Sequence, residues 1–131
     1  MVLDTSALIA ILVDEPERSV FIRAIEEAAS CRVSTATFVE TSIVLEARYG
    51  AEALRILDRF IAKAQIEILP VDLEQGHTAC RAFSRFGKGR HRAGLNYGDC
   101  FAYALANVLA EPLLCKGADF THTDVRLAIE A

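Results

Sequence analysis

The chain begins with Met1-Val2-Leu3-Asp4-Thr5-Ser6-Ala7, and the rest of the fold can be interpreted outward from this segment. Residues 1–3 are apolar and predict a short buried strand, while Asp4-Thr5-Ser6 predicts a turn that caps the next helix. Asp4 is thereby placed at the carboxyl end of the strand. In an open parallel sheet, this is the end at which functional groups gather.

The alternation of strand and helix continues along the chain. Three further apolar segments are predicted to be strands, at residues 31–33, 66–69 and 113–115. Apolar spacing and capping residues predict six helices, over residues 7–13, 17–29, 37–48, 51–64, 72–86 and 97–109. The tail from residue 117 is left open between a loop, a short strand and a helix. This order predicts a single α/β domain over residues 1–131 with a central parallel sheet.

The composition narrows the class of protein. Hydrophobic residues make up 53% of the chain, which indicates either an apolar surface for a partner or an alanine-rich core. The longest apolar run, residues 7–13, is far shorter than the ~20 residues of a membrane span. No basic segment precedes this run, so no signal peptide is expected and the expected location is cytoplasmic. The four cysteines form no C-x-x-C pair and are expected to be small buried apolar residues.

Positive charge is concentrated in one part of an acidic chain. The formal net charge is −4, yet residues 75–98 contain no Asp or Glu. The same segment holds five basic residues, which are Arg81, Arg85, Lys88, Arg90 and Arg92. Residues 87–94 are expected to form a glycine- and arginine-rich loop. Local positive charge on an acidic body is typical of a protein that holds both cations and phosphates.

Two aspartates are the first candidates for a functional site. Asp4 follows the first predicted strand, and Asp99 lies in the first turn of the helix over residues 97–109. Ala102 and Ala106 share a helix face with Asp99, which predicts close packing on the sheet and partial burial of the carboxylate. A buried, unpaired carboxylate is unfavourable, so a cation is its natural partner. The alternative role of both aspartates is to cap a helix or complement its dipole.

Glu40 and Asp119 extend the acidic set. Glu40 is predicted in the first turn of the helix over residues 37–48, where its alternative role is to complement the helix dipole. Asp119 follows the fourth predicted strand, and Asp124 is a rival for the same role. Oxygen ligands without His or Cys partners favour Mg²⁺ or Mn²⁺ over zinc. Such an ion activates water and orients a phosphodiester, as nucleic-acid hydrolysis requires.

Four motifs occur in a characteristic order along the chain. They are Met1-Val2-Leu3-Asp4-Thr5-Ser6-Ala7, Ser34-Thr35-Ala36-Thr37-Phe38-Val39-Glu40, Asn96-Tyr97-Gly98-Asp99 and Lys116-Gly117-Ala118-Asp119-Phe120. Together they closely resemble the PIN-domain ribonucleases, and specifically the VapC toxins of type II toxin–antitoxin pairs. The resemblance covers essentially the whole chain, and residues 87–99 are similar to one VapC subgroup. It implies a PIN-like three-layer α/β/α fold with a central parallel sheet.

The resemblance also implies a function. VapC toxins cleave RNA endonucleolytically with Mg²⁺, form homodimers, and are inhibited by a VapB-like antitoxin whose C-terminal segment occupies the active-site groove. Carried over to this chain, Asp4 and Asp99 become the principal metal ligands. Glu40 becomes a further acidic site residue that binds metal or positions water. Asp119 matches the fourth acidic position, where the family varies most.

The polar residues around these acids have expected roles of their own. Thr5 or Ser6 is expected to form hydrogen bonds within the site. Residues expected to bind substrate phosphates are Lys88, Arg90 and Arg92, with Lys116 as a further candidate. The three loop residues have two alternative roles, as a solvated surface or as a contact to an acidic antitoxin segment. The alternative for Lys116 is an ion pair with a site carboxylate.

Two other functions compete with the nuclease. A catalytically silent PIN-like binding module would keep the fold and the partner surface, although the presence of all four acids argues against it. In a receiver-type signalling domain, Asp4 would be the metal ligand, Asp72 the phosphate acceptor and Lys116 the active-site lysine. Asp72 is better explained as a helix cap, and Thr5 stands where a receiver normally has a second acid.

Overall fold

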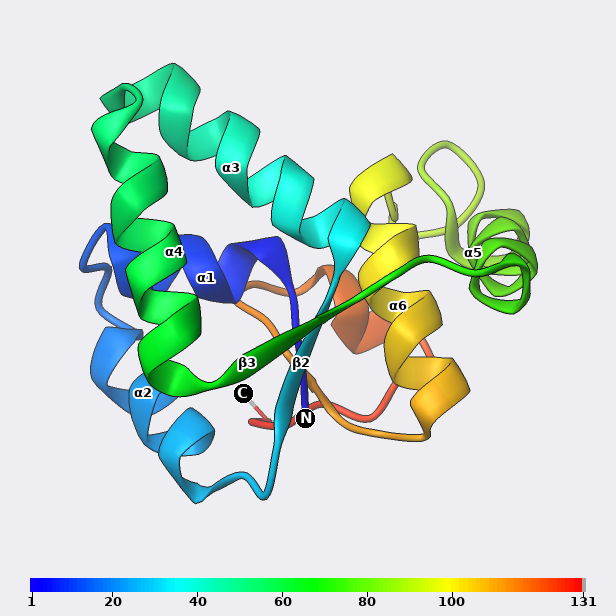
Figure 1. The fold of residues 1–131 in the computed structure, drawn as a ribbon. Helices are drawn as coiled ribbons and strands as arrows, with labels where there is room; N and C mark the ends of the chain where they lie inside the picture. The colour runs from blue at the N-terminus through cyan, green and yellow to red at the C-terminus, as the bar shows by residue number, and fades with distance from the viewer. Residues whose placement is uncertain (131) are drawn as a thin grey trace.

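Four short parallel strands form the centre of the computed structural model, which describes residues 1–130 (Figure 1). The strands are β1 (Val2–Leu3), β2 (Cys31–Ser34), β3 (Ile66–Leu69) and β4 (Leu113–Leu114). Their order in the sheet is β3-β2-β1-β4, so β1 lies between β2 and β4. All three neighbouring pairs are parallel, and the carboxyl ends of the strands therefore lie at one edge of the sheet.

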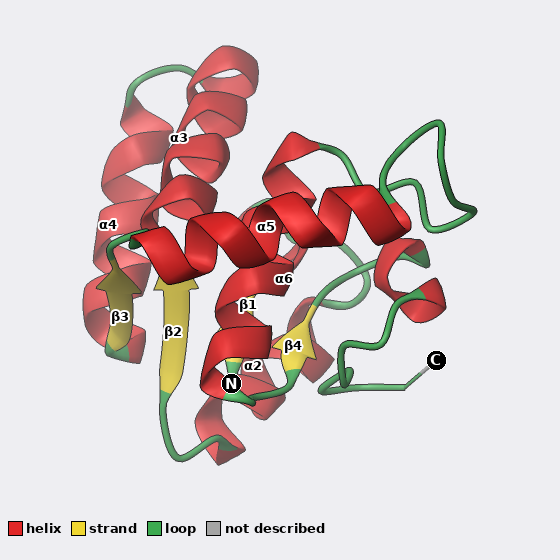
Figure 2. Ribbon diagram, turned by 90° about the vertical axis from the view of Figure 1, so that its right-hand side faces the viewer, coloured by secondary structure: helices red, strands yellow, loops and turns green. Residues whose placement is uncertain are grey.

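Six α-helices within residues 1–130 pack on the two faces of this sheet (Figures 1 and 2). They are α1 (Thr5–Leu12), α2 (Arg18–Glu27), α3 (Thr35–Tyr49), α4 (Glu52–Ala64), α5 (Leu73–Phe86) and α6 (Tyr97–Leu109). None of them is long and apolar enough to cross a membrane.

The two faces of the sheet have separate hydrophobic cores. Alternate residues of a strand point to opposite faces of a sheet. Val2 and Leu113 accordingly enter a core with residues of α5 and α6, whereas Leu3 and Leu114 enter a second core with residues of α1 and α2. Helices close both cores, which confirms the predicted three-layer α/β/α arrangement.

Two helices begin earlier than the sequence pattern predicts. α1 begins at Thr5 and α3 begins at Thr35, because the side chains of Asp4 and Ser34 cap them. The capping side chain, rather than the first apolar residue, sets the start of each helix. Glu40 consequently lies in the second turn of α3, so its predicted place in the first turn is wrong. The helix-dipole alternative for Glu40 is removed with it.

The tail, whose structure the sequence leaves open, covers the β4 edge of the sheet. A short 3-10 helix, η1 (Asp119–His122), follows β4 and buries Phe120. Further along, Leu127 forms a bridge to Leu113, whose N–H donates to the Arg126 carbonyl at 2.9 Å. These contacts satisfy backbone groups that an edge strand would otherwise expose.

The cysteines match their expected role only in part. Cys31 and Cys100 are buried and Cys115 is half-buried, but Cys80 is exposed. Cys80 lies on α5 next to the buried face of that helix, not within it. The prediction that all four cysteines are buried is therefore wrong at this position.

Candidate active site

Four acidic side chains lie around the carboxyl ends of the strands. Asp4 directly follows β1, Asp119 begins η1 after β4, and Asp99 lies in the first turn of α6. Glu40 comes from α3, whose first turns lie beside those of α6 (Figure 1). Burial, followed by the negative charges of Asp4, Asp119 and Glu40, raises the pKa of Asp99 to about 6. The fold thus brings the other three acids predicted from the sequence close enough for their charges to act on Asp99.

Asp4 is the most deeply buried of these acids, with 4% of its surface exposed. The Ser6 N–H and the Ser6 hydroxyl both donate to Asp4 Oδ2, at 3.1 and 2.6 Å. The Ser6 hydroxyl oxygen also accepts a 2.9 Å hydrogen bond from the Lys116 backbone N–H, which ties the end of β4 to the start of α1. Burial raises the pKa of Asp4, the Ser6 hydrogen bonds oppose this, and the charge of Glu40 adds to it. The Ser6 and backbone contacts therefore fix the position of Asp4, while burial and the charge of Glu40 destabilise its ionised form.

A capping box holds Asp99 at the start of α6. The Asp99 N–H donates to Asn96 Oδ1 at 2.9 Å, and the Asn96 N–H donates to Asp99 Oδ2 at 3.0 Å. Reciprocal bonds of this kind fix both the helix start and the carboxylate. The capping role considered as an alternative for Asp99 is thus present. It engages only Oδ2, however, and leaves Oδ1 available to a cation.

Glu40 is positioned by a hydroxyl group from another helix and by the absence of a side chain at one position of α6. Thr5 Oγ1 donates to Glu40 Oε1 at 2.5 Å, and the Thr41 hydroxyl lies 3.4 Å from Thr5 Oγ1. On the other side, a Cβ atom added to Gly98 would lie 2.1 Å from Glu40 Oε2 and 2.6 Å from the carboxyl carbon. The carboxylate of Glu40 can therefore occupy its place only because residue 98 has no side chain.

Gly98 is a site residue that reasoning from the sequence missed. It stands in the first turn of an alanine-rich helix, where glycine is less favourable than alanine by about 1 kcal/mol. A glycine in a helix, directly before Asp99, indicates that another group of the protein approaches the backbone closely at that position. The approaching group itself could not be identified, because Glu40 lies far away in the sequence.

The two rival aspartates of the tail have different surroundings. Asp124 accepts hydrogen bonds from the Tyr103 hydroxyl at 2.5 Å and from Arg85 Nη1 at 3.2 Å. Both of its carboxylate oxygens are thus engaged by protein groups. Asp119 instead contributes its charge to the neighbourhood of Asp99. These contacts favour Asp119 as the fourth acid.

Asp124→Asn is expected to lower the free energy of unfolding at pH 7, with the loss disappearing in acid. The Tyr103 hydrogen bond, helped by the Arg85 charge, lowers the pKa of Asp124 below its ordinary value of 3.8. The ionised carboxylate therefore contributes stability above pH 3.8, and this stability is lost as the pH falls through the folded-state pKa. The expected loss at pH 7 is only about 0.5–1 kcal/mol, because about half of the side chain is exposed. Denaturant unfolding of both chains at neutral and strongly acidic pH measures the difference; an equal difference at both would contradict this assignment.

The basic residues of the loop are exposed and free of carboxylate partners within residues 1–130. This holds for Lys88, Arg90 and Arg92, while the Arg90 guanidinium lies 5.8 Å from the centre of the Phe83 ring. The loop is closed by hydrogen bonds of 2.9 Å between the Lys88 N–H and the Leu95 carbonyl and between the Leu95 N–H and the Phe86 carbonyl. It leads directly into the capping box of α6.

Lys116 is not paired with any of the four acids. Its ammonium group forms ion pairs with Glu15 and, at 3.4 Å, with Glu17. The first-listed cause of its raised pKa is the hydrogen bond to Glu15. The sequence-based alternative of an ion pair with a site carboxylate is therefore wrong, because the segment between α1 and α2 supplies nearer partners.

The four acids fit a hard divalent cation as an incomplete ligand set. Within residues 1–130, no three His, Cys, Asp or Glu side chains are gathered into a complete metal-binding group. None of the four acids forms an ion pair with a basic side chain in the same range. Mg²⁺ is usually held by one or two carboxylates and keeps several waters, so two of these acids would be enough as protein ligands. The nearby Cys115 thiol does not compete, because burial and the charges of Asp4, Asp119 and Asp99 raise its pKa to about 12.

Comparison with known proteins places this chain in a family. The family model described as "PIN domain" matches residues 1–126. A VapC ribonuclease of Mycobacterium bovis is 49% identical over 125 residues, which cover 95% of each chain. A ribonuclease VapC of Mycolicibacterium smegmatis is 50% identical over 125 residues, covering 95% of this chain and 97% of that one. The chain belongs to the VapC ribonucleases of the PIN-domain family.

Solved VapC structures share the fold at much lower identity. Mycobacterium tuberculosis VapC20, described as a Sarcin-Ricin loop cleaving toxin, superposes with a TM-score of 0.79 at 14% identity, covering 99% of this chain and 98% of that one. The VapBC2 complex of Rickettsia felis, bound to a DNA fragment from its promoter, superposes with a TM-score of 0.75 at 11% identity, covering 96% and 94%. At these identities, the likeness concerns the fold alone.

Membership of the VapC ribonucleases confirms the resemblance found in the sequence. The four motifs that carry the resemblance each contribute one acid to the same site: Asp4, Glu40, Asp99 and Asp119. In this VapC chain, the motifs are distant in sequence and meet only where the strands end.

Proposed function

We propose that this VapC-family chain is the toxin of a toxin–antitoxin pair and that it hydrolyses RNA phosphodiester bonds endonucleolytically. The observation that carries the proposal is the group of four acids, which form no ion pair with a basic side chain within residues 1–130. Burial and the charges of the other three acids raise the pKa of Asp99 to about 6. A divalent cation would relieve this repulsion. The ribonuclease names of the relatives support RNA as the substrate. The cytoplasm is the proposed place of action.

Asp4 and Asp99 are the proposed ligands of Mg²⁺, with Mn²⁺ as the alternative ion. When bound, such an ion polarises the phosphodiester and makes water a stronger nucleophile near neutral pH. Glu40, held by Thr5, would orient the attacking water and accept its proton. Ser6 keeps Asp4 in place through two hydrogen bonds, so that one ligand does not reorganise during the reaction.

The exposed loop that precedes α6 is the proposed contact to the RNA backbone. Lys88, Arg90 and Arg92 would bind phosphates on either side of the scissile bond, since they are exposed and unpaired within residues 1–130. Lys116 is a weaker candidate, because Glu15 and Glu17 already engage its ammonium group.

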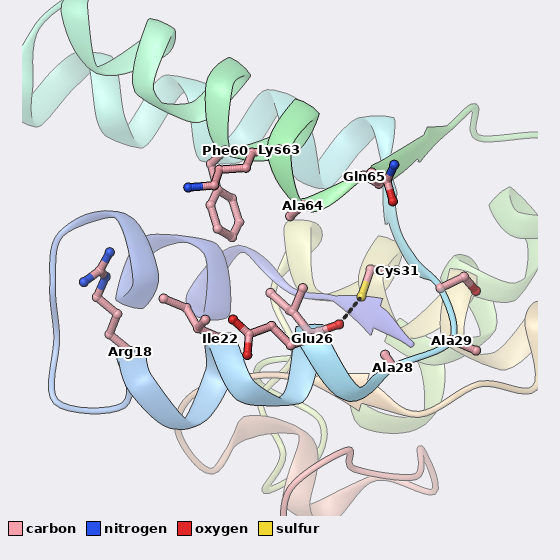
Figure 3. Close-up of a pocket in the computed structure, with 12 residues that line it drawn as sticks. Arg18, Ile22, Glu26, Ala28, Ala29, Cys31, Phe60, Lys63, Ala64 and Gln65 are labelled. Atoms are coloured by element: carbon pink, nitrogen blue, oxygen red, sulfur yellow. Dashed lines mark hydrogen bonds between the residues drawn. The ribbon is translucent and has the colours of Figure 1, made fainter.

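A groove between α2 and α4 is the proposed docking site for a VapB-like antitoxin helix. Figure 3 shows Phe60 and Ala64 of α4 facing Ile22 of α2, and Arg18 and Lys63 are among the charged residues that line the same cavity of about 540 Å³. An apolar floor with a charged rim suits an amphipathic helix. The antitoxin's C-terminal segment is proposed to extend from there to the acidic site.

A second copy of the chain is the proposed partner of exposed apolar side chains on α3, α5 and α6. Val39 and Ile43 of α3, Leu73 of α5 and Tyr97 of α6 are all exposed, and Tyr97 is 80% exposed. Contact with a second copy would remove these apolar side chains from water. Light scattering on the chain alone and after adding antitoxin tests both assemblies. A single-chain mass without antitoxin would exclude the homodimer, and an unchanged mass with antitoxin would exclude the complex.

The first test of the function is RNA cleavage by the purified chain, freed of any antitoxin. Total cellular RNA with Mg²⁺ or Mn²⁺ is expected to yield discrete fragments, and both EDTA and the Asp99→Asn substitution are expected to abolish them. Cleavage that persists in EDTA would contradict the metal ligands. A folded chain that cleaves nothing with either metal would instead support the catalytically silent binding module.

A further inference from the structure

A small polar cavity lies between α5 and α6, outside the acidic site. Its volume is about 130 Å³, and it is lined by Thr78, Arg81, Ala82, Arg85, Tyr103 and Asn107. None of these side chains is acidic. The opposite flank of the same helix pair is an apolar cavity lined by residues such as Phe83 and Phe101. The two guanidinium groups, which are donors suited to an anion, therefore line the polar cavity and not the apolar one.

Two guanidinium groups define the chemistry of the polar cavity. Arg81 forms no ion pair within residues 1–130, and its Nη2 donates to Thr78 Oγ1 at 3.1 Å. A guanidinium has five N–H donors, so most of those on Arg81 remain available. Arg85 Nη1 donates a hydrogen bond to Asp124, and the Tyr103 hydroxyl donates a second hydrogen bond to the same carboxylate. The planar fork of an arginine matches two oxygens of a phosphate group.

The position of the cavity relates it to the proposed RNA path. Arg81 and Arg85 are one helical turn apart, about 6 Å along the axis of α5. Figure 2 shows α5 running into the long loop before α6, which carries the basic residues at positions 88, 90 and 92. Tyr103 and Asn107 lie one and two turns beyond Asp99 on α6. The positive charges thus continue from the loop, away from the acids, toward this cavity.

We propose that this cavity binds a backbone phosphate of the RNA substrate, remote from the bond that is cleaved. The inference rests on the proposed function for the identity of its ligand. Arg81 and Arg85 hold the phosphate oxygens, and Asn107 supplies a further amide donor. The site adds affinity for RNA that is long enough to reach it, and it contributes nothing to a short RNA that spans only the acids.

Equilibrium binding in EDTA tests the proposal without cleavage. Fluorescent single-stranded RNAs of 20 and 4 nucleotides are titrated with the unmodified chain, with Arg81→Gln, and with Arg23→Gln as the matched control. Arg23 is exposed on α2 and forms no ion pair within the described part of the chain. We expect Arg81→Gln to weaken binding of the 20-nucleotide RNA about fivefold and to reduce the slope of log affinity against log salt by about 0.7. Binding of the 4-nucleotide RNA is expected to stay unchanged.

The outcomes separate this inference from the proposed nuclease. If Arg81→Gln matches Arg23→Gln on the 20-nucleotide RNA, or weakens both RNAs equally, the phosphate site is overturned. Stabilisation of the unmodified chain by inorganic phosphate that is lost in Arg81→Gln, without any effect on RNA binding, would also overturn it in favour of a free-phosphate site. If the chain cleaves no RNA with Mg²⁺ but Arg81→Gln weakens its binding of the 20-nucleotide RNA, the proposed nuclease function is rejected and the proposed phosphate site is supported.

Discussion

Replacing Asp4 by asparagine is expected to lower the rate of RNA cleavage about a thousandfold while the chain stays folded. Asparagine has nearly the same shape as aspartate, and its amide oxygen can still accept the Ser6 hydrogen bonds. Only the negative charge is lost, and with it the stronger part of the attraction for a divalent cation. Losses of this size are typical when a group that stabilises the charged transition state is removed.

The same substitution is expected to raise thermal stability in the absence of metal. Burial raises the pKa of Asp4, and the charge of Glu40 adds to it, so the ionised side chain is destabilising at neutral pH. Removing the charge is therefore expected to increase the free energy of unfolding at neutral pH. A gain in stability together with a loss of activity is the expected property of a site built for a cation.

Thermal unfolding with and without Mg²⁺ provides a readout independent of cleavage. Mg²⁺ is expected to raise the melting temperature of the unmodified chain, because it binds the folded state, and to leave Asp4→Asn unchanged. Asp58→Asn is the matched control, since Asp58 is exposed on α4 and forms no ion pair within residues 1–130. An equal response of Asp4→Asn and Asp58→Asn to Mg²⁺ would exclude Asp4 as a ligand.

The second large effect is expected from Gly98→Ala, which adds a single methyl group. This methyl would lie 2.1 Å from Glu40 Oε2, so either the Glu40 carboxylate or the start of α6 has to move. The Thr5–Glu40 hydrogen bond of 2.5 Å would be strained or lost with that movement. Because a misplacement of about 1 Å can cost about a hundredfold in rate, we expect kcat to fall 10- to 100-fold. RNA binding in EDTA is expected to change little, since the methyl group does not touch the basic loop.

Gly76→Ala provides the matched control for this substitution. Gly76 lies within α5, and a Cβ atom added there meets nothing within 4 Å. Alanine at this position is expected to stabilise the chain by about 0.5–1 kcal/mol and to leave cleavage unchanged. Cleavage by Gly98→Ala at the rate of Gly76→Ala would show that the close approach of Glu40 to α6 has no role in the reaction.

Much of the fold was predictable because the information is local. The strand at Ile66–Leu69 and the helix at Tyr97–Leu109 have the predicted bounds, since apolar alternation and an Asn96 cap are properties of neighbouring residues. The early starts of α1 and α3 were missed, because capping by Asp4 and Ser34 extends each helix past its first apolar residue. This error moved Glu40 from the second turn to the first.

The acids of the candidate site were predictable for a related reason. A carboxylate directly after a buried strand, such as Asp4, must lie at the carboxyl edge of a parallel sheet whatever the rest of the chain does. Asp119 and Asp124 were both compatible with this rule. The choice between them required the structure, because the Tyr103 side chain of α6 and the Arg85 side chain of α5 both bind Asp124.

The sequence was enough to derive the order of strands and helices, the family, and the acids that gather where the strands end. Strand and helix formation and capping depend on residues close together in the chain, so they can be derived without coordinates. The three-dimensional structure was needed to show that Gly98 makes room for Glu40, that Lys116 pairs with Glu15, and that Arg81 lines a cavity between two helices. The first two contacts join residues 58 and 101 positions apart, and the third depends on how α5 crosses α6. Sequence periodicity contains no information about the distance between such side chains.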